Sequence, residues 1–178
     1  SEYSGTDGAP ASSDYYSIPY NKLRQVNNLI TQGVAYSGTD NISEPMGQAY
    51  FFRAFWHFFL LKRFGGVPIA TYVPSVNSGL VDGPRASRYE VVQQILSDLN
   101  KADSLLSSAS VTKTSTNNDG HVNIETICAF KARVCLFEGT WEEYNGRGTD
   151  DSTNGDGTTD GGGTTIPSSY PTVKELLT

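Results

Sequence analysis

The chain has 178 residues, of which 37% are hydrophobic and 11% aromatic, and this is enough apolar material for one domain with a buried core. Its formal net charge of −6 excludes a broad electrostatic attraction to nucleic acid or to anionic lipid, and it suits an uncharged partner. No signal-peptide pattern stands at the start of the sequence, so we expect any targeting segment to lie outside it. We expect the chain to be a piece of a longer protein.

Residues 1–16 are rich in Ser, Gly and Asp, a composition typical of a loop. A first helix is predicted over residues 19–34, because side chains at helical spacing form one face. That face consists of Tyr20, Leu23, Asn27, Ile30 and Val34. The aromatic side chains Tyr3, Tyr15 and Tyr16 are then expected in the preceding loop.

The second helix has the clearest pattern in the sequence. Ser43 is a suitable N-cap, Pro45 fits the first turn, and Gly65-Gly66 ends the helix. Residues 49–61 between these signals are almost entirely aromatic or aliphatic. The run is shorter than the roughly 20 residues of a membrane span and contains Arg53, so we expect a helix that other helices enclose.

A third helix begins with the capping box Ser87-Arg88-Tyr89-Glu90. The residues expected in its core are Val91 or Val92, Ile95, Leu99, Ala102 and Leu106. A fourth helix is predicted over residues 123–144, with small side chains that let a neighbouring helix approach. These are Cys128, Ala129, Ala132 and Cys135.

The two cysteines, Cys128 and Cys135, stand seven positions apart on the predicted fourth helix. Seven residues of helix separate Cα atoms by about 10 Å, which is too far for a disulfide. We expect both to be small apolar core residues. Pairing with a segment outside this sequence is the alternative, so the cysteines do not decide the compartment.

Four core helices within residues 17–144 predict a single all-α domain over the whole chain. Their order, as two antiparallel pairs, favours a tetratricopeptide-like helical repeat, an α–α superhelix with long irregular loops. Residues 67–73, between the pairs, are the candidate for a short extended segment. Residues 145–167 are dominated by Gly, Thr and Asp and predict a flexible surface insertion, and residues 168–178 read as the start of a next helix.

Four sequence blocks occur in a characteristic order. They are residues 20–30, residues 47–54 with the turn Phe64-Gly65-Gly66-Val67-Pro68, residues 87–92 with 98–102, and residues 120–123 with 129–140. Together they resemble the SusD/RagB family, whose most recognisable block is an aromatic helix that ends in a Phe/Tyr-Gly-x-Val-Pro turn. Gln48 stands where the family usually has Glu.

The resemblance implies a SusD-like, non-catalytic binding protein of nutrient uptake. Members of the family are lipid-anchored on the outer face of the outer membrane, hold oligosaccharides for import, and lie over a SusC-like TonB-dependent transporter. The membrane link is then only a lipid anchor that this sequence lacks. Members are much longer than this chain, and much of their ligand surface lies in the part not included here.

The residues alone leave two other functions open. One is a helical-repeat adaptor that binds a protein and no sugar, which a regular repeat of about 34 residues would favour. The other is a fragment of a helical-toroid glycoside hydrolase, which opposed acidic residues across a cleft would favour.

Residues suited to catalysis or metal binding are not apparent in the sequence. Glu138 and Glu142 share a helix face close to Glu143, but acids on one turn are expected to form a solvated face and not to flank a substrate. His57 and His121 have no third ligand at zinc spacing, and His57 is expected to be hydrogen-bonded inside the helix stack. We therefore predict no catalytic residue, no cofactor and no metal.

Residues 150–156 resemble half of a calcium loop, with oxygen-bearing side chains at alternate positions and Gly155 at the sixth. Asp150, Asn154 and Asp156 are weak calcium candidates, because the bidentate Glu of position 12 is missing. A flexible loop is the preferred interpretation.

Sugar binding requires aromatic faces that stack on pyranose rings. Tyr15, Tyr16 and Tyr3 are the candidates for such stacking, and Tyr72 is a less clear one. The alternative is that these rings pack over the end of the first helix. The aromatic side chains of the second helix are expected to form core and not a ligand site.

Overall fold

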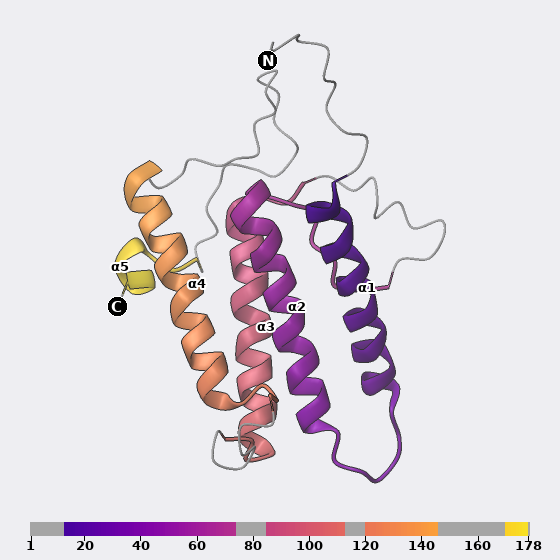
Figure 1. The fold of residues 1–178 in the computed structure, drawn as a ribbon. Coiled ribbons are helices and arrows are strands. Elements are labelled where there is room, and N and C mark those ends of the chain that lie inside the picture. The colour runs from indigo at the N-terminus through magenta and orange to yellow at the C-terminus, as the bar shows by residue number, and fades with distance from the viewer. Residues whose placement is uncertain (1–12, 74–84, 113–119, 146–169, 178) are drawn as a thin grey trace.

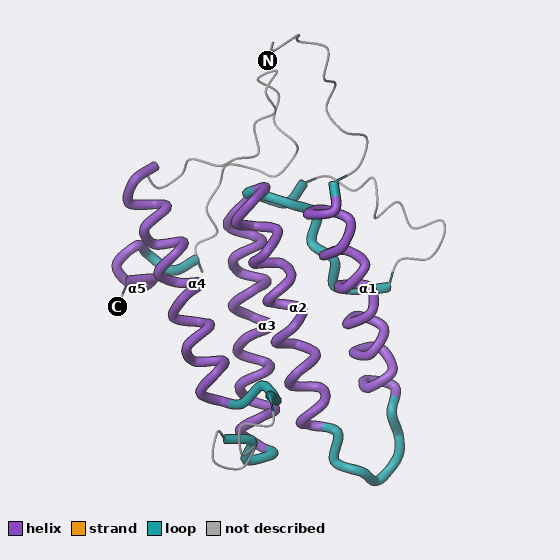
Figure 2. The backbone as a smooth tube through the Cα atoms, in the orientation of Figure 1, coloured by secondary structure: helices purple, strands orange, loops and turns teal. Residues whose placement is uncertain are grey.

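The computed structural model describes residues 13–73, 85–112, 120–145 and 170–177. Its helices are α1 (Asp14–Ala35), α2 (Ser43–Phe64), α3 (Arg88–Ser108), α4 (Ile124–Asn145) and the short α5 (Val173–Leu177). In Figure 1, α2 and α3 lie at the centre, α1 and α4 flank them, and α5 lies beside α4. The described residues contain no strand, and the segment 67–73 is a loop (Figure 2). The all-α prediction is confirmed.

Contact between α2 and α3 is the most extensive in the fold. Gly47 lets the two helices approach closely, because a Cβ atom there would lie 2.6 Å from Leu106 Cδ2. Every residue predicted for the core of α3 is buried, and Val91 and Val92 are both buried where one was expected. Burial of each such aliphatic side chain stabilises the fold by roughly 1.5–3 kcal/mol relative to an exposed one.

Helix α1 begins one and a half turns before the predicted start, at Asp14 with Ser13 as N-cap. Pro19 therefore lies inside the helix and not in its first turn. Tyr16 packs against Tyr20 and against Phe64 of α2, with ring centroids 4.8 and 5.3 Å apart. Proline removes one hydrogen bond from the helix, and each of these ring contacts stabilises the same turn by roughly 0.5–1.5 kcal/mol.

The ends of α2 agree with the prediction in part. The N-cap is Ile42, and Ser43 is already helical; the Asn41 side chain accepts the Ser43 backbone N–H at 3.0 Å. The prediction of Ser43 as the capping side chain is therefore wrong by one residue, because Asn41 supplies the acceptor from two residues upstream. At the other end, Gly65 adopts φ 66°, a left-handed value that favours glycine, as the predicted stop requires.

The capping box at the start of α3 is confirmed. The Glu90 backbone N–H donates to Ser87 Oγ at 3.2 Å, and the Ser87 backbone N–H donates to Glu90 Oε2 at 2.7 Å. The predicted start of a helix near the end of the chain is also present. There, the Thr172 backbone N–H donates to Glu175 Oε2 at 2.7 Å and the Glu175 N–H donates to Thr172 Oγ1 at 3.2 Å.

Helix α4 departs most from expectation. Cys128 is exposed and Cys135 is half-buried, both as free thiols, and Ala129 and Ala132 are exposed. The expected core role of Cys128 is wrong, because α4 turns another face inward. Its buried residues are Ile127, Val134, Glu138, Gly139 and Glu142.

The expectation that other helices enclose α2 is confirmed for one side only. Phe51 and Phe58 are buried, whereas Phe52 is 41% exposed and Trp56 is half-buried. Likewise Val34, predicted on the inner face of α1, is 72% exposed. Among the described residues, no helix combines the length and the apolar character that crossing a bilayer requires.

Candidate functional site

A buried polar network joins α1, α2 and α3. Arg53 donates from Nε to Asp98 Oδ2 at 2.9 Å and from Nη2 to Asp98 Oδ1 at 2.6 Å. Its Nη1 donates to Asn27 Oδ1 at 3.3 Å and to the Thr71 carbonyl at 3.2 Å. Asn27 in turn donates to the carbonyl of Ala70 at 2.9 Å. The network thus positions the loop after α2 against all three helices.

His57 belongs to the same buried region and is completely buried. The Ala70 N–H donates to Nε2 at 3.2 Å, so Nδ1 carries the proton and donates to the Arg53 carbonyl at 3.0 Å. Burial lowers the pKa of His57 from 6.5 to about 4, against the opposing effect of Asp98. His57 is therefore a neutral, hydrogen-bonded structural residue, as predicted.

A second buried network joins α3, α4 and the segment before α5. Arg88 Nε donates to both carboxylate oxygens of Glu138 at 2.9 Å, and its guanidinium lies 3.9 Å from the ring centroid of Trp141. Tyr170 donates its hydroxyl to Glu138 Oε1 at 3.2 Å. Glu142 lies one turn further along α4 and is also buried.

The prediction of a solvated acidic face is therefore wrong: Glu138 is 0% and Glu142 1% exposed. Burial raises the pKa of Glu138, and the Arg88 guanidinium opposes that rise. The carboxylates face Arg88 and Tyr170 inside the protein and not an open cleft. A glycosidase needs two acids on either side of a substrate, and this pair leaves no room for one.

Two of the tyrosines proposed for sugar stacking, Tyr15 and Tyr16, lie on α1 and not in a loop. Tyr16 is 39% exposed and packs over the carboxyl end of α2, which is the alternative considered for it. Tyr15 is 61% exposed. The Arg63 guanidinium lies 4.9 Å from the Tyr15 ring centroid and 3.8 Å from that of Phe59, so a cation that contacts both rings supports the exposed tyrosine.

Several predicted residues lie outside the part of the chain that the structure describes. They are Tyr3 and the calcium candidates Asp150, Asn154 and Asp156. Tyr72 is described and is 47% exposed; its carbonyl accepts a hydrogen bond from Asn27 Nδ2 at 3.2 Å. Within the described ranges, no group of three or more His, Cys, Asp or Glu side chains is arranged to hold a metal ion.

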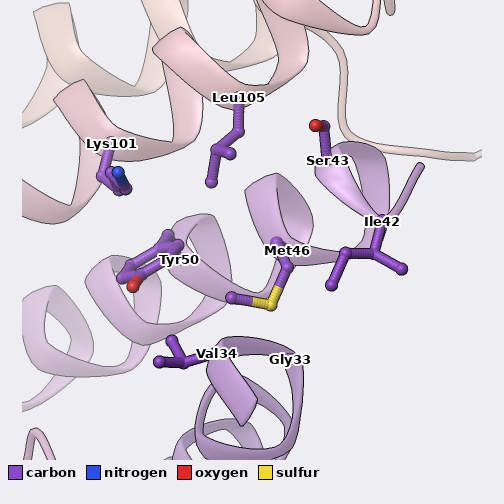
Figure 3. Close-up of a pocket in the computed structure, with 8 residues that line it drawn as sticks. All are labelled: Gly33, Val34, Ile42, Ser43, Met46, Tyr50, Lys101 and Leu105. Atoms are coloured by element: carbon purple, nitrogen blue, oxygen red, sulfur yellow. The ribbon is translucent and has the colours of Figure 1, made fainter. Parts of the chain in front are cut away.

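A pocket of about 290 Å³ lies where α1 and α3 flank the amino-terminal half of α2 (Figure 3). Leu105 points from α3 toward Tyr50 and Met46 of α2, and Lys101 lies on α3 on the side of Tyr50. The eight lining residues are Gly33, Val34, Ile42, Ser43, Met46, Tyr50, Lys101 and Leu105. This pocket could not be predicted from the sequence, because its walls come from three helices whose relative placement the sequence pattern does not determine.

The structure is a helical scaffold with buried ion pairs in its interior and aromatic side chains at its surface. Over residues 3–136 the chain matches the SusD-like family that is described as starch-binding and associating with the outer membrane, and it belongs to that family. The resemblance to the SusD/RagB family that the four sequence blocks carry is therefore confirmed. The family consists of non-catalytic binding proteins.

Individual relatives agree with this assignment. The chain is 32% identical over 103 residues to SusD-like protein P38 of Formosa agariphila, an overlap of 58% of this chain and 19% of that protein. A SusD-like protein of Bacteroides fragilis matches with a TM-score of 0.60 and 26% identity, over 73% of this chain and 25% of the other. The chain thus spans only about a fifth to a quarter of the length of these proteins.

Two further solved structures share the fold at lower identity. A SusD superfamily protein of Bacteroides vulgatus matches with a TM-score of 0.61 at 18% identity, over 76% of this chain and 26% of its own. A SusD-like carbohydrate-binding protein of Bacteroides fragilis matches with a TM-score of 0.60 at 18% identity, over 72% and 24%. At this identity the likeness concerns the fold.

Proposed function

We propose that this chain is the helical scaffold of a glycan-capture protein at the bacterial surface. The full-length protein, lipid-anchored on the outer face of the outer membrane, holds an oligosaccharide and delivers it to a SusC-like TonB-dependent transporter. The observation that carries the proposal is the match of residues 3–136 to a family described as starch-binding and associating with the outer membrane.

The distribution of charge and aromatic surface supports binding without catalysis. Arg53, Asp98, Arg88 and Glu138 are all committed to buried pairs, so they do not face a ligand. Tyr15 is 61% exposed and is supported from one side by Arg63. An exposed aromatic ring held in place by its neighbours loses little conformational freedom when a sugar stacks on it.

Affinity electrophoresis tests the proposal. This chain and the full-length protein are run side by side through native gels that contain neutral or acidic polysaccharides, starch among them. Retardation of the full-length protein by one glycan class supports capture and names the substrate. Retardation of neither protein by any polysaccharide would overturn the proposal.

A helical-repeat adaptor without sugar binding is the second candidate. It is favoured by the outward face of α2, where Phe52 is 41% exposed beside the half-buried Phe55, Trp56 and Phe59. If no glycan retards the protein, a pull-down with the chain as bait tests for a protein partner. Loss of that partner in Phe52→Asp would then identify the α2 face as the contact.

A further inference from the structure

We propose that the pocket between α1, α2 and α3 binds one acidic sugar residue, a pyranose that carries a carboxylate or a sulfate. The inference rests on the proposed function for glycan as the ligand, and it adds a binding site and a charge preference. The volume of about 290 Å³ is at the lower limit of the roughly 300–1,000 Å³ of small-molecule sites. It suits one sugar ring and not a run of several.

The lining of the pocket has the composition of a small-molecule site. Four aliphatic or thioether side chains form its walls, and they are Val34, Ile42, Met46 and Leu105. Three polar groups lie among them: the Ser43 and Tyr50 hydroxyls and the Lys101 ammonium. A mostly apolar wall with a few convergent polar groups is the usual form of such sites.

The net charge of −6 disfavours an anionic ligand over the protein as a whole, but the charge inside the pocket is positive and selects the class of ligand there. Lys101 is the charged residue among the eight that line the pocket. In the described part of the chain, neither its ammonium nor the Tyr50 hydroxyl has a hydrogen-bond or ion-pair partner. A purely aliphatic ligand would strip water from these groups and leave them without partners. A sugar acid offers an anion for Lys101, hydroxyl groups for Ser43 and Tyr50, and C–H faces for the apolar wall.

The geometry of the pocket is held by contacts outside it. The Arg53 guanidinium lies 5.0 Å from the Tyr50 ring centroid, and Arg53 itself is fixed by Asp98. Gly33 leaves room for the Met46 thioether, because a Cβ atom at Gly33 would overlap Met46 Sδ. Gly33→Ala therefore displaces the thioether that lines the pocket, while the charge of Lys101 stays unchanged.

A single NMR signal reports on this pocket, because Met46 is the one methionine among the 178 residues. The chain is labelled with [13C-methyl]methionine and titrated with glucuronate, glucose 6-sulfate, glucose and acetate at constant ionic strength. We expect a saturable shift of the Met46 methyl signal with glucuronate or the sulfated sugar, and none with glucose or acetate. Comparison of the two acidic sugars distinguishes carboxylate from sulfate recognition.

Two variants distinguish the effect of the charge in the pocket from the effect of the pocket's shape. Lys101→Gln is expected to weaken binding about fivefold at low salt, the size of effect of a solvent-accessible ion pair, and Gly33→Ala to reduce it with the charge intact. The control Lys22→Gln removes an exposed charge on α1, away from the pocket, and is expected to bind as the wild type does.

Three results would overturn the inference: no saturable shift with either acidic sugar, an equal shift with glucose or acetate, or binding unchanged in Lys101→Gln. If the Met46 signal stays silent while a polysaccharide still retards the chain in the affinity gel, the pocket assignment fails and glycan capture stands.

Discussion

Arg53 on α2 and Asp98 on α3 form an ion pair through two hydrogen bonds of 2.9 and 2.6 Å. Their side chains are 9% and 2% exposed, so both charges are removed from water. A buried pair of this kind contributes little net stability, because desolvation opposes the attraction. Loss of one partner is costly, since the other charge then remains buried alone.

Removal of Arg53 is therefore expected to destabilise the chain more than removal of both partners. Arg53→Met leaves the Asp98 carboxylate buried without its cation and should cost about 3–5 kcal/mol of unfolding free energy. The double variant Arg53→Met/Asp98→Leu should regain most of that loss. Urea unfolding followed by circular dichroism measures both, and strictly additive losses would argue against the ion pair.

Burial of His57 is expected to make the free energy of unfolding depend on pH. Because its pKa is lowered from 6.5 to about 4 in the folded chain, the unfolded chain binds the proton at higher pH than the folded chain does. The contribution of His57 is present above about pH 6.5 and is lost as the pH falls toward 4, a loss of about 3 kcal/mol. We expect urea midpoints to fall more between pH 7 and pH 4.5 in the wild type than in His57→Gln. Equal falls would contradict this account of His57.

Gly66 explains why the Gly-Gly-Val-Pro turn has glycine at its second position. A Cβ atom there would overlap the Ala86 carbonyl oxygen, and the Ala86 N–H donates to the Val67 carbonyl at 3.3 Å. Gly66→Ala must move backbone, so we expect a cost of about 1–3 kcal/mol in thermal or urea unfolding. Gly47→Ala meets the flexible end of Leu106 instead and should cost less. The reverse order would show that the turn yields more easily than the helix pair.

Tyr170 fastens the segment before α5 to the core through its bond to Glu138. Tyr170→Phe removes a donor to a buried carboxylate and should cost about 1.5–3 kcal/mol. Amide exchange in residues 173–177 should quicken at the same time. Tyr36→Phe is the matched control, because its bond to Asp40 is exposed, and it should change stability little. Similar losses in the two variants would contradict the distinction.

Helix positions and the principal core were predictable from the sequence, because apolar spacing and capping residues are local signals. The capping box at Ser87 and the stop at Gly65 are examples, and both are present in the structure. The early start of α1 was not predictable in the same way. It depends on contacts of Tyr16 with Phe64, a residue distant in the sequence.

The inward face of α4 could not be predicted from polarity alone. Glu138 and Glu142 appear polar in the sequence, but Arg88, 50 positions before Glu138, provides a buried partner. Ala129, Ala132 and Cys128, which have the size and polarity of core residues, are turned outward as a result, and Cys135 is half-buried. The pocket at Lys101 escaped prediction for the same reason, since the arrangement of three helices creates it.

The most direct test of the central claim is isothermal titration of this chain with an oligosaccharide of the glycan that retards the full-length protein. The account predicts saturable binding that Tyr15→Ala weakens and Tyr144→Ala leaves unchanged, although Tyr144 on α4 is the more exposed ring at 89% against 61%. No binding, or an equal loss of affinity in both variants, would contradict a glycan site on this scaffold. The protein-binding adaptor would then be the favoured function.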